Sequence, residues 1–175
     1  MPFTLDHPDF SITPIDSAHT EQLQALFERC ADYALIVEGG AVSPHAAQEA
    51  LQETPPGRSL ADKYLFGVWQ PQAQLVGVLE GMRDYPEESI YWIGLMMLDP
   101  AVRGQGLGLR LVQRFGAWAQ AQGATALMLG VVADNHPAFA FWQRQGFELV
   151  RVSEPRTFGK KVQTVSVLRK ALPAD

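Results

Sequence analysis

Three glycines and an arginine stand close together in the second half of the chain, at Arg103, Gly104, Gly106 and Gly108. They follow an apolar run, Ile90–Leu98, and precede residues with helical spacing, so they are predicted to lie at a helix N-terminus. Unpaired backbone N–H groups and the positive end of the helix dipole point outward there, and glycines let an anion approach the backbone closely. The turn is therefore suited to phosphate, with the permanent charge of Arg103 beside it.

Three kinds of phosphate-binding turn can be compared with this segment. A P-loop requires a lysine followed by serine or threonine after the last glycine, whereas Leu109 and Arg110 follow here. A dinucleotide-binding fingerprint requires a third glycine at the position of Leu109. A pyrophosphate clamp of the form Arg/Gln-x-x-Gly-x-Gly/Ala is filled by Arg103, Gly106 and Gly108 without a gap. The third pattern describes the segment best, and a plain strand-to-helix turn is the alternative.

The wider sequence resembles the GNAT superfamily of N-acetyltransferases. The first matching stretch is Leu98-Asp-Pro-Ala-Val-Arg-Gly-Gln-Gly-Leu-Gly, which resembles the superfamily's pyrophosphate motif after its fourth strand. The second is Asn135-His-Pro-Ala-Phe-Ala-Phe-Trp-Gln-Arg-Gln-Gly-Phe147, which resembles the Asn-x-x-Ala…Tyr…Gly-Phe signature after the fifth strand. The closing Leu168-Arg-Lys-Ala-Leu is also typical of the last strand. The motifs cover roughly the second half of the chain, and the first half fits by the order of its elements alone.

The resemblance implies a single acetyltransferase domain over residues 1–175 that uses acetyl-coenzyme A (acetyl-CoA). The acetyl group would pass directly to the primary amine of a small molecule or peptide, because acetyl-CoA is already an activated thioester. Met97 and Leu98 would bind the pantetheine amides through their backbones, and Asn135 would contact the cofactor from the side of the fifth strand. The pyrophosphate would lie on the turn that consists of Arg103, Gly104, Gln105, Gly106, Leu107 and Gly108.

The residues that would move protons are marked less clearly. Many relatives have a tyrosine that protonates the leaving thiolate, and Trp142, which cannot serve as a proton donor at neutral pH, takes its place here. Ile90–Leu98 has no carboxylate, so Glu80 on the preceding apolar stretch is the candidate catalytic base or amine ligand, with a solvated edge position as the alternative. Glu38 and Asp84 are weaker candidates. Because of these departures, a non-catalytic protein that binds or senses acyl-CoA is the second functional hypothesis.

A sheet and covering helices must hold the glycine turn, and the hydrophobic patterns predict both. Helices are expected over residues 19–33, 43–52 and 137–145, and from Leu107 to just before Gly123. The fold class is α/β, or α+β by some schemes. The resemblance implies a mixed, mostly antiparallel central sheet, splayed between its fourth and fifth strands, with helices on both faces. Strands are expected near residues 10–14 and over 64–70, 75–84, 90–98, 124–132, 147–152 and 163–170.

Composition and charge narrow the range of partners. The chain has 175 residues, 47% of them hydrophobic, which fits one globular domain with a real core. Its net charge of −5 argues against a nucleic-acid partner and weakly favours a cationic substrate. The most apolar stretches, residues 93–98 and 124–132, are far shorter than the ~20 residues that cross a bilayer, and the N-terminus does not resemble a secretory signal. We therefore expect a cytoplasmic protein that engages no membrane.

The potential metal ligands and nucleophiles are few. Cys30 is the only cysteine, so an intramolecular disulfide is excluded, and its helical spacing from Leu26 and Phe27 predicts a buried side chain. The apolar strands could serve a homodimer interface or simply the core. No metal site is expected, because the histidines are scattered at His7, His19, His45 and His136.

Overall fold

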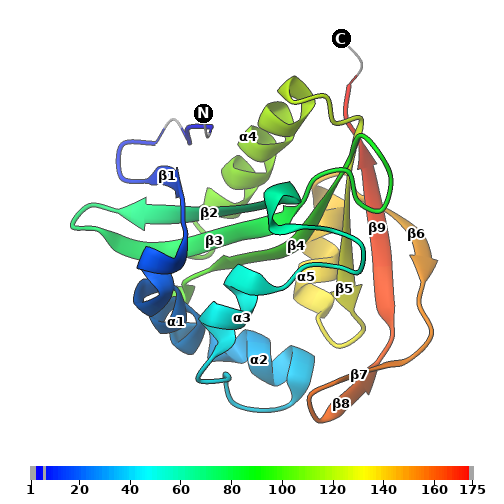
Figure 1. Ribbon diagram of the computed structural model, residues 1–175, viewed down its shortest axis with the longest axis horizontal. Coiled ribbons are helices and arrows are strands. Elements are labelled where there is room, and N and C mark those ends of the chain that lie inside the picture. The colour runs from blue at the N-terminus through cyan, green and yellow to red at the C-terminus, as the bar shows by residue number, and fades with distance from the viewer. Residues whose placement is uncertain (1–2, 6, 174–175) are drawn as a thin grey trace.

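In the computed structural model, which describes residues 3–5 and 7–173, the centre is a seven-stranded sheet in the order β1-β2-β3-β4-β5-β9-β6 (Figure 1). Its strands are β1 (Ser11–Pro14), β2 (Lys63–Gln70), β3 (Gln74–Met82), β4 (Ile90–Leu98), β5 (Ala126–Val132), β6 (Glu148–Val152) and β9 (Val165–Ala171). A small separate hairpin pairs β7 (Arg156–Phe158) with β8 (Lys161–Gln163). The helices are α1 (Thr20–Arg29), α2 (Ala31–Glu38), α3 (Ala46–Gln52), α4 (Leu107–Ala121) and α5 (His136–Arg144), with short 3-10 turns η1 (Ser17–His19), η2 (Leu60–Asp62) and η3 (Pro100–Val102).

The sheet opens between β4 and β5. These two strands are parallel, whereas the other neighbouring strands are antiparallel. Their pairing ends where Ile93 faces Leu129, although β4 continues to Leu98. The register between β3 and β4 also shifts here, so that Gly94 has no partner on β3. The mixed, splayed sheet predicted from the sequence is therefore confirmed.

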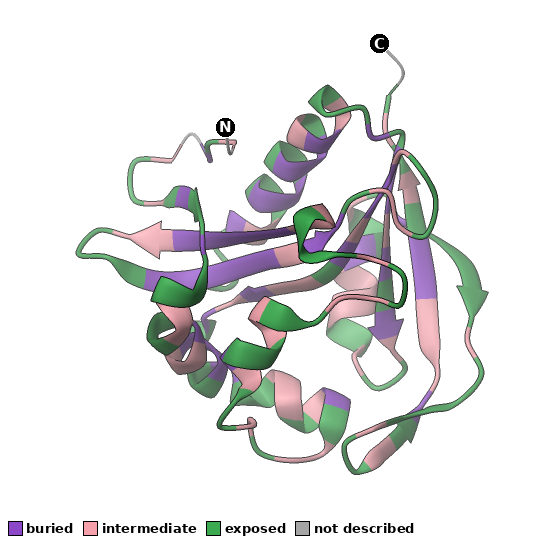
Figure 2. Cartoon of the chain, viewed as in Figure 1, coloured by how far each residue is buried: buried purple, intermediate pink, exposed green. Residues whose placement is uncertain are grey.

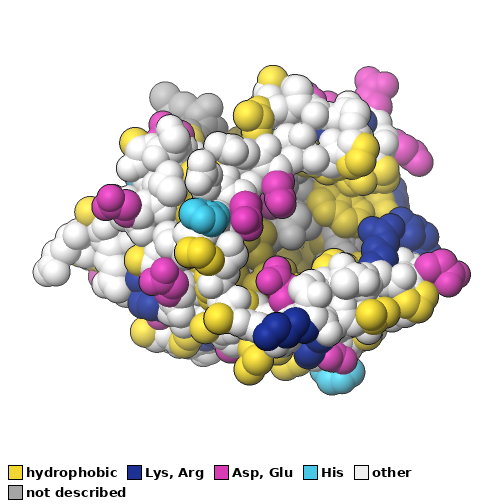
Figure 3. Space-filling model, turned by 60° about the horizontal axis from the view of Figure 1, so that its bottom comes forward, with side chains coloured by type: hydrophobic (Ala, Val, Ile, Leu, Met, Phe, Trp, Pro, Cys, Tyr) yellow, Lys and Arg dark blue, Asp and Glu magenta, His cyan; other side chains and the backbone are white. Residues whose placement is uncertain are grey.

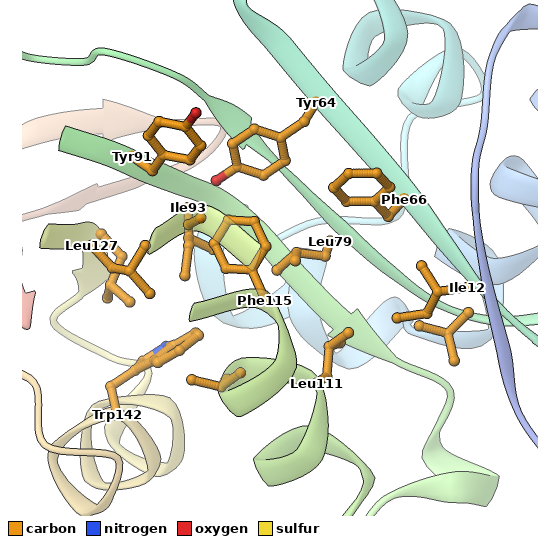
Figure 4. Close-up of a cluster of buried hydrophobic side chains, with 14 of the residues drawn as sticks. Ile12, Tyr64, Phe66, Leu79, Tyr91, Ile93, Leu111, Phe115, Leu127 and Trp142 are labelled. Atoms are coloured by element: carbon orange, nitrogen blue, oxygen red, sulfur yellow. The ribbon is translucent and has the colours of Figure 1, made fainter. Parts of the chain in front are cut away.

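One face of the sheet is covered by α4 and α5. The apolar residues of α4 recur at helical spacing, and Leu111 and Phe115 are fully buried. They pack with Tyr64, Phe66 and other side chains of one sheet face (Figure 4). Burying a side chain of this size contributes roughly 2–3 kcal/mol, so this layer fixes α4 against the sheet.

The opposite face is covered by α1 and α3. Leu23, Leu26 and Phe27 of α1 pack against Leu65 and other residues of the alternate sheet face. Figure 2 shows burial concentrated on the central strands and on the helix faces turned toward them. The strand β6 at the edge, by contrast, is exposed along its length. Helices thus lie on both faces, as expected.

The structure differs from the predicted elements in three places. The helix expected over residues 19–33 breaks at Cys30, whose φ of −98° and ψ of 32° separate α1 from α2. The buried Cys30 thiol donates to the Leu98 carbonyl at 3.4 Å, so contacts with β4 hold this break. The next helix begins at Ala46 rather than near Ser43. The hairpin β7–β8 was not predicted. None of the described helices has the length and hydropathy needed to span a bilayer.

Candidate active site

The glycine turn between β4 and α4 leaves an open helix end. Gly104 and Gly106 have φ of +75° and +80°, which explains glycine at both positions. A Cβ added at either residue would meet nothing within 4 Å, so the surface of the turn is free. No side chain caps the N-terminus of α4, whose first residue follows Gly106. The first N–H groups of this helix are therefore available to an anion.

The side chain of Arg103 is turned away from this helix end and toward α2. Its guanidinium forms two hydrogen bonds with the Asp32 carboxylate, Nη1 to Oδ2 at 2.5 Å and Nη2 to Oδ1 at 3.1 Å. Its Nε donates to the Leu98 carbonyl at 2.8 Å. Hydrogen bonding from Arg103 holds the pKa of Asp32 below its ordinary value, so the pair is ionic at neutral pH. Arg103 thus links the turn to α2. The groups available to an anion are the backbone N–H donors of the residues that follow it in the turn.

A second ion pair anchors the start of the turn. Asp99 is only 5% exposed, and its carboxylate accepts from the Ala101 N–H at 2.9 Å and from Arg29 Nε. Arg29 also donates to the Leu75 carbonyl at 2.6 Å, which links α1, β3 and the turn. Burial alone would raise the pKa of Asp99, but these hydrogen bonds outweigh it and lower that pKa. Two ion pairs consequently fix the chain just before the turn and at its first residue.

The other predicted pyrophosphate residues are divided between the surface and the core. Gln105 is exposed and donates from Nε2 to the Ala101 carbonyl at 3.2 Å. Leu107 is buried in the core beneath α4. Gly108 lies against the aromatic ring of Phe141, which a Cβ would approach to 3.5 Å. Gln105 and Leu107 therefore shape the turn, and a small residue at position 108 lets α4 approach α5.

A narrow cavity of about 110 Å³ lies in the gap between β4 and β5. Asn135 lines it, and its Oδ1 accepts from the Ala138 N–H at 3.3 Å, which caps α5. Trp142 also lines it but is only 6% exposed and packs against Phe147, with ring centroids 5.1 Å apart. Figure 4 shows Trp142 beside the buried cluster. The position that holds a tyrosine in many relatives is thus occupied here by a core residue.

A larger cavity of about 670 Å³ lies on the side of the sheet covered by α1, α2 and α3. Met97 is buried and lines this cavity, whereas its neighbour Leu98 packs toward the opposite core. Figure 3 shows a hollow in this face with carboxylate side chains around it. The residues that line the cavity include Phe27, Cys30, Tyr33, Glu38, Val42, Glu49, Glu53, Lys63, Glu80, Trp92, Gly94 and Leu95.

Glu80 lies in this cavity and is paired with a buried lysine. Its Oε1 accepts from Lys63 Nζ at 2.6 Å, and the two side chains are 15% and 7% exposed. Lys63 Nζ also donates to the Glu53 carbonyl at 2.8 Å. Glu80 Oε2 lies above Gly94, where a Cβ would come within 2.7 Å of it. The carboxylate is thereby held where the β4–β5 gap begins.

The pKa of Glu80 is raised above its ordinary value. Burial is the main cause, and the nearby Glu53 charge adds to it, whereas the charge and hydrogen bond of Lys63 oppose it. A carboxylate with a raised pKa is a stronger base than an exposed one. The arrangement can therefore accept a proton from a group bound in the cavity.

Tyr33 connects the two cavities. Together with Gly94 and Leu95, it lines both the larger cavity and the β4–β5 gap. Burial, with smaller contributions from Glu38 and Glu80, raises the pKa of Tyr33 to about 12. Its hydroxyl therefore stays protonated at neutral pH and can donate a hydrogen bond.

Sequence reasoning missed two of these residues. Lys63 opens a strand and gave no signal of its own, because its partner lies 17 positions away. Gly94 interrupts an apolar strand, a pattern that often marks a bulge or a close approach. Asp84 does not line the larger cavity, whereas Glu38 does. Among residues 3–5 and 7–173, no group of three or more histidine, cysteine or acidic side chains is arranged to hold a metal.

Comparisons with known proteins agree with this fold. Solved structures with the same fold include an acetyltransferase from Thermus thermophilus, with a TM-score of 0.77 and 23% identity over 94% of this chain and 97% of that one. Another is a Salmonella typhimurium acetyltransferase that modifies the N-terminal serine of a 50S ribosomal subunit protein, with a TM-score of 0.76 and 16% identity over 95% and 97% of the chains. An Escherichia coli ribosomal-protein alanine N-acetyltransferase has a TM-score of 0.68 and 15% identity over 95% and 96%.

No curated protein sequence matches the chain significantly. The model of the acetyltransferase (GNAT) family matches residues 20–147, which include the glycine turn, Glu80 and the Asn135 cap. The match covers well over half of the chain and includes the open end of α4 and the splayed strands described above. The chain belongs to the GNAT family of acetyltransferases.

Proposed function

We propose that the protein transfers an acetyl group from acetyl-CoA to a primary amine bound in the larger cavity. The observation that carries the proposal is the position of Glu80. A buried lysine holds this carboxylate above Gly94, where the larger cavity meets the β4–β5 gap. A base at that junction can act on an amine in one cavity while the acyl donor enters from the other.

The turn between β4 and α4 suits the pyrophosphate of coenzyme A. The left-handed glycines Gly104 and Gly106 leave space above the backbone, and no side chain occupies the end of α4. Because Asp32 engages Arg103, we assign anion binding mainly to backbone N–H groups from Gly104 to Gly108. Arg103 contributes by holding the turn and by its charge.

The β4–β5 gap suits the pantetheine and the thioester. Beyond Ile93, β4 no longer pairs with β5, so its backbone groups on that side are free of the parallel ladder. The Leu98 carbonyl is already engaged by Arg103 and Cys30. We therefore assign the backbone contacts to Leu95 and Met96, which line the gap together with Asn135.

The chemistry requires little of the protein, because acetyl-CoA supplies an activated thioester. The amine nitrogen bonds to the acetyl carbon, the carbon–sulfur bond breaks, and Glu80 takes the proton that the nitrogen loses. Trp142 is packed in the core and supplies no acid. We assign to Tyr33, whose pKa of about 12 keeps its hydroxyl protonated, a hydrogen bond to the leaving sulfur.

The proposal is tested by measuring thiol release from acetyl-CoA across a panel of diamines, aminoglycosides, amino acids and peptides with free N-termini. We expect amine-dependent thiol release for at least one class. Tight binding of acetyl-CoA with no release for any amine would refute the proposal and would instead support a non-catalytic acyl-CoA sensor.

A further inference from the structure

The walls of the larger cavity carry an excess of negative charge. Four carboxylates line it, and they come from α2, α3, the segment after α3, and β3. Lys63 is the one basic side chain of this described lining, and it is already paired with Glu80. The acidic side chains are Glu38, Glu49, Glu53 and Glu80.

Three of these carboxylates have no cationic partner within the described chain. The side chains of Glu38 and Glu53 form no hydrogen bond with another described residue, and only their backbone carbonyls accept, from the Lys160 N–H and from Lys63 Nζ. The Glu49 carboxylate accepts only a long hydrogen bond from the Ser43 hydroxyl, at 3.4 Å. Several negative charges around one cavity make its electrostatic potential more negative, and the cavity therefore attracts cations.

The charges act together on the interior of the cavity. Besides burial, the Glu53 charge raises the pKa of Glu80, and the charges of Glu38 and Glu80 raise that of Tyr33. Tyr33 is half-buried, and its hydroxyl forms no hydrogen bond with another described residue, so the hydroxyl is available to a molecule bound in the cavity. A volume of about 670 Å³ lies within the ordinary range for small-molecule sites.

Resting on the proposed acetyl transfer, we propose that the acceptor is a small aliphatic amine with at least one further ammonium group. One nitrogen is neutral and reacts beside Glu80. The second remains protonated and lies among Glu38, Glu49 and Glu53, with which no cationic side chain of the described residues is paired. A monoamine of equal length would leave these carboxylates unpaired, so the cavity distinguishes the two by charge.

A neighbouring cavity of about 430 Å³ offers the opposite chemistry and defines the competing hypothesis. It shares Trp92 with the larger cavity and is lined by Arg151, Arg156 and Arg169. An acceptor with an anionic end, such as an amino acid or an acidic peptide, would place that end here. We favour the oligocationic acceptor because the carboxylates, and not the arginines, share a cavity with Glu80.

The test compares hexamethylenediamine, hexylamine and aminocaproic acid, which share a chain length and differ in the charge of the second end. We expect kcat/KM for the diamine to exceed that for hexylamine by about ten-fold. Glu49→Gln and Glu53→Gln should each lower the ratio of the diamine value to the hexylamine value by roughly three-fold. Glu21→Gln, which removes the same charge from α1 outside the cavity lining, is the matched control and should change neither.

Equal kcat/KM for hexylamine and the diamine would overturn the inference. So would a preference for aminocaproic acid or an acidic peptide that Arg169→Ala abolishes. Calorimetric binding of hexamethylenediamine without acetyl-CoA separates this inference from the proposed reaction. Binding that weakens in Glu49→Gln and Glu53→Gln supports an oligocation site even if no thiol is released, and binding equal to that of hexylamine contradicts it.

Discussion

The Glu80 carboxylate occupies the space above Gly94 that a side chain at residue 94 would otherwise fill, since a Cβ there would lie 2.7 Å from Glu80 Oε2. Gly94 is also skipped in the β3–β4 register, between Ile93 and Leu95, and it directly follows the last β4–β5 pair. Gly94 therefore lies where the sheet opens and also leaves the space that the Glu80 carboxylate occupies.

Gly94→Ala should displace the base without unfolding the protein. The group nearest to the new methyl is the end of a flexible side chain, so we expect Glu80 to move at a cost of about 1–3 kcal/mol. Turnover should fall by about ten-fold, because the proton acceptor leaves its position. Thermal denaturation and kcat measure the two effects. Gly40→Ala, where a Cβ meets nothing within 4 Å, should change neither.

Glu80→Gln keeps the shape of the side chain and removes its basicity. We expect kcat to fall by about 100-fold while the Kd for acetyl-CoA stays unchanged, because Glu80 lies in the acceptor cavity. Because the pKa of Glu80 is raised, the acidic fall in wild-type activity should lie above the ordinary value of 4.5. Wild-type turnover in Glu80→Gln at every pH would remove this residue from the mechanism.

Lys63→Met tests whether the buried lysine tunes the base. The charge and hydrogen bond of Lys63 lower the pKa of Glu80 and thus oppose the effect of burial. Their removal should raise that pKa further and move the acidic limb of kcat/KM to higher pH. The limb is measured with the same amine for both proteins, so that the titration of the amine cancels. An unshifted limb would mean that Lys63 has only a structural role.

Asp32→Asn should weaken the attachment of the glycine turn in a pH-dependent manner. The folded pKa of Asp32 is lowered, so its stabilisation is present above the unfolded value of 3.8 and is lost as the pH falls through the folded pKa. Since Asp32 and Arg103 are 49% and 39% exposed, we expect the loss at neutral pH to be below about 1 kcal/mol. Urea denaturation at neutral and acidic pH measures it, and a pH-independent difference would contradict the ionic role.

Gly106→Trp should block the pyrophosphate site. The indole would cover the open end of α4, and we expect the Kd for acetyl-CoA to rise by at least ten-fold, or about 1.4 kcal/mol. Gly123→Trp is the matched control, because Gly123 also has positive φ and free space around it but follows the other end of α4. Calorimetry should detect weaker binding in the first variant alone, and unchanged affinity in Gly106→Trp would refute the site.

The sequence predicted the elements that have strong local signals. Apolar runs identified the strands, and Gly104, Gly106 and Asn135 marked the ends of α4 and α5. The break at Cys30 had no such signal, because neither proline nor glycine stands there and contacts with Leu98 determine it. The hairpin β7–β8 was not predicted because its strands are only three residues long.

Only those parts of the site that have a local sequence signal could be predicted. The glycine turn is local and could be read from its spacing. The pairs of Arg103 with Asp32 and of Lys63 with Glu80 join residues 71 and 17 positions apart, and only the folded chain brings them together. The acidic lining draws residues from separate elements, so net charge alone could suggest a cationic substrate only weakly.

Acetyl transfer from acetyl-CoA to an amine is tested by counting both products of one incubation, with mass spectrometry for acetylated amine and a thiol assay for coenzyme A. We predict one equivalent of acetylated amine for each equivalent of thiol released, and a matching loss of both in Glu80→Gln. Thiol release without acetylated amine would show hydrolysis instead of transfer and would refute the proposed function. Binding of acetyl-CoA with neither product would refute it as well.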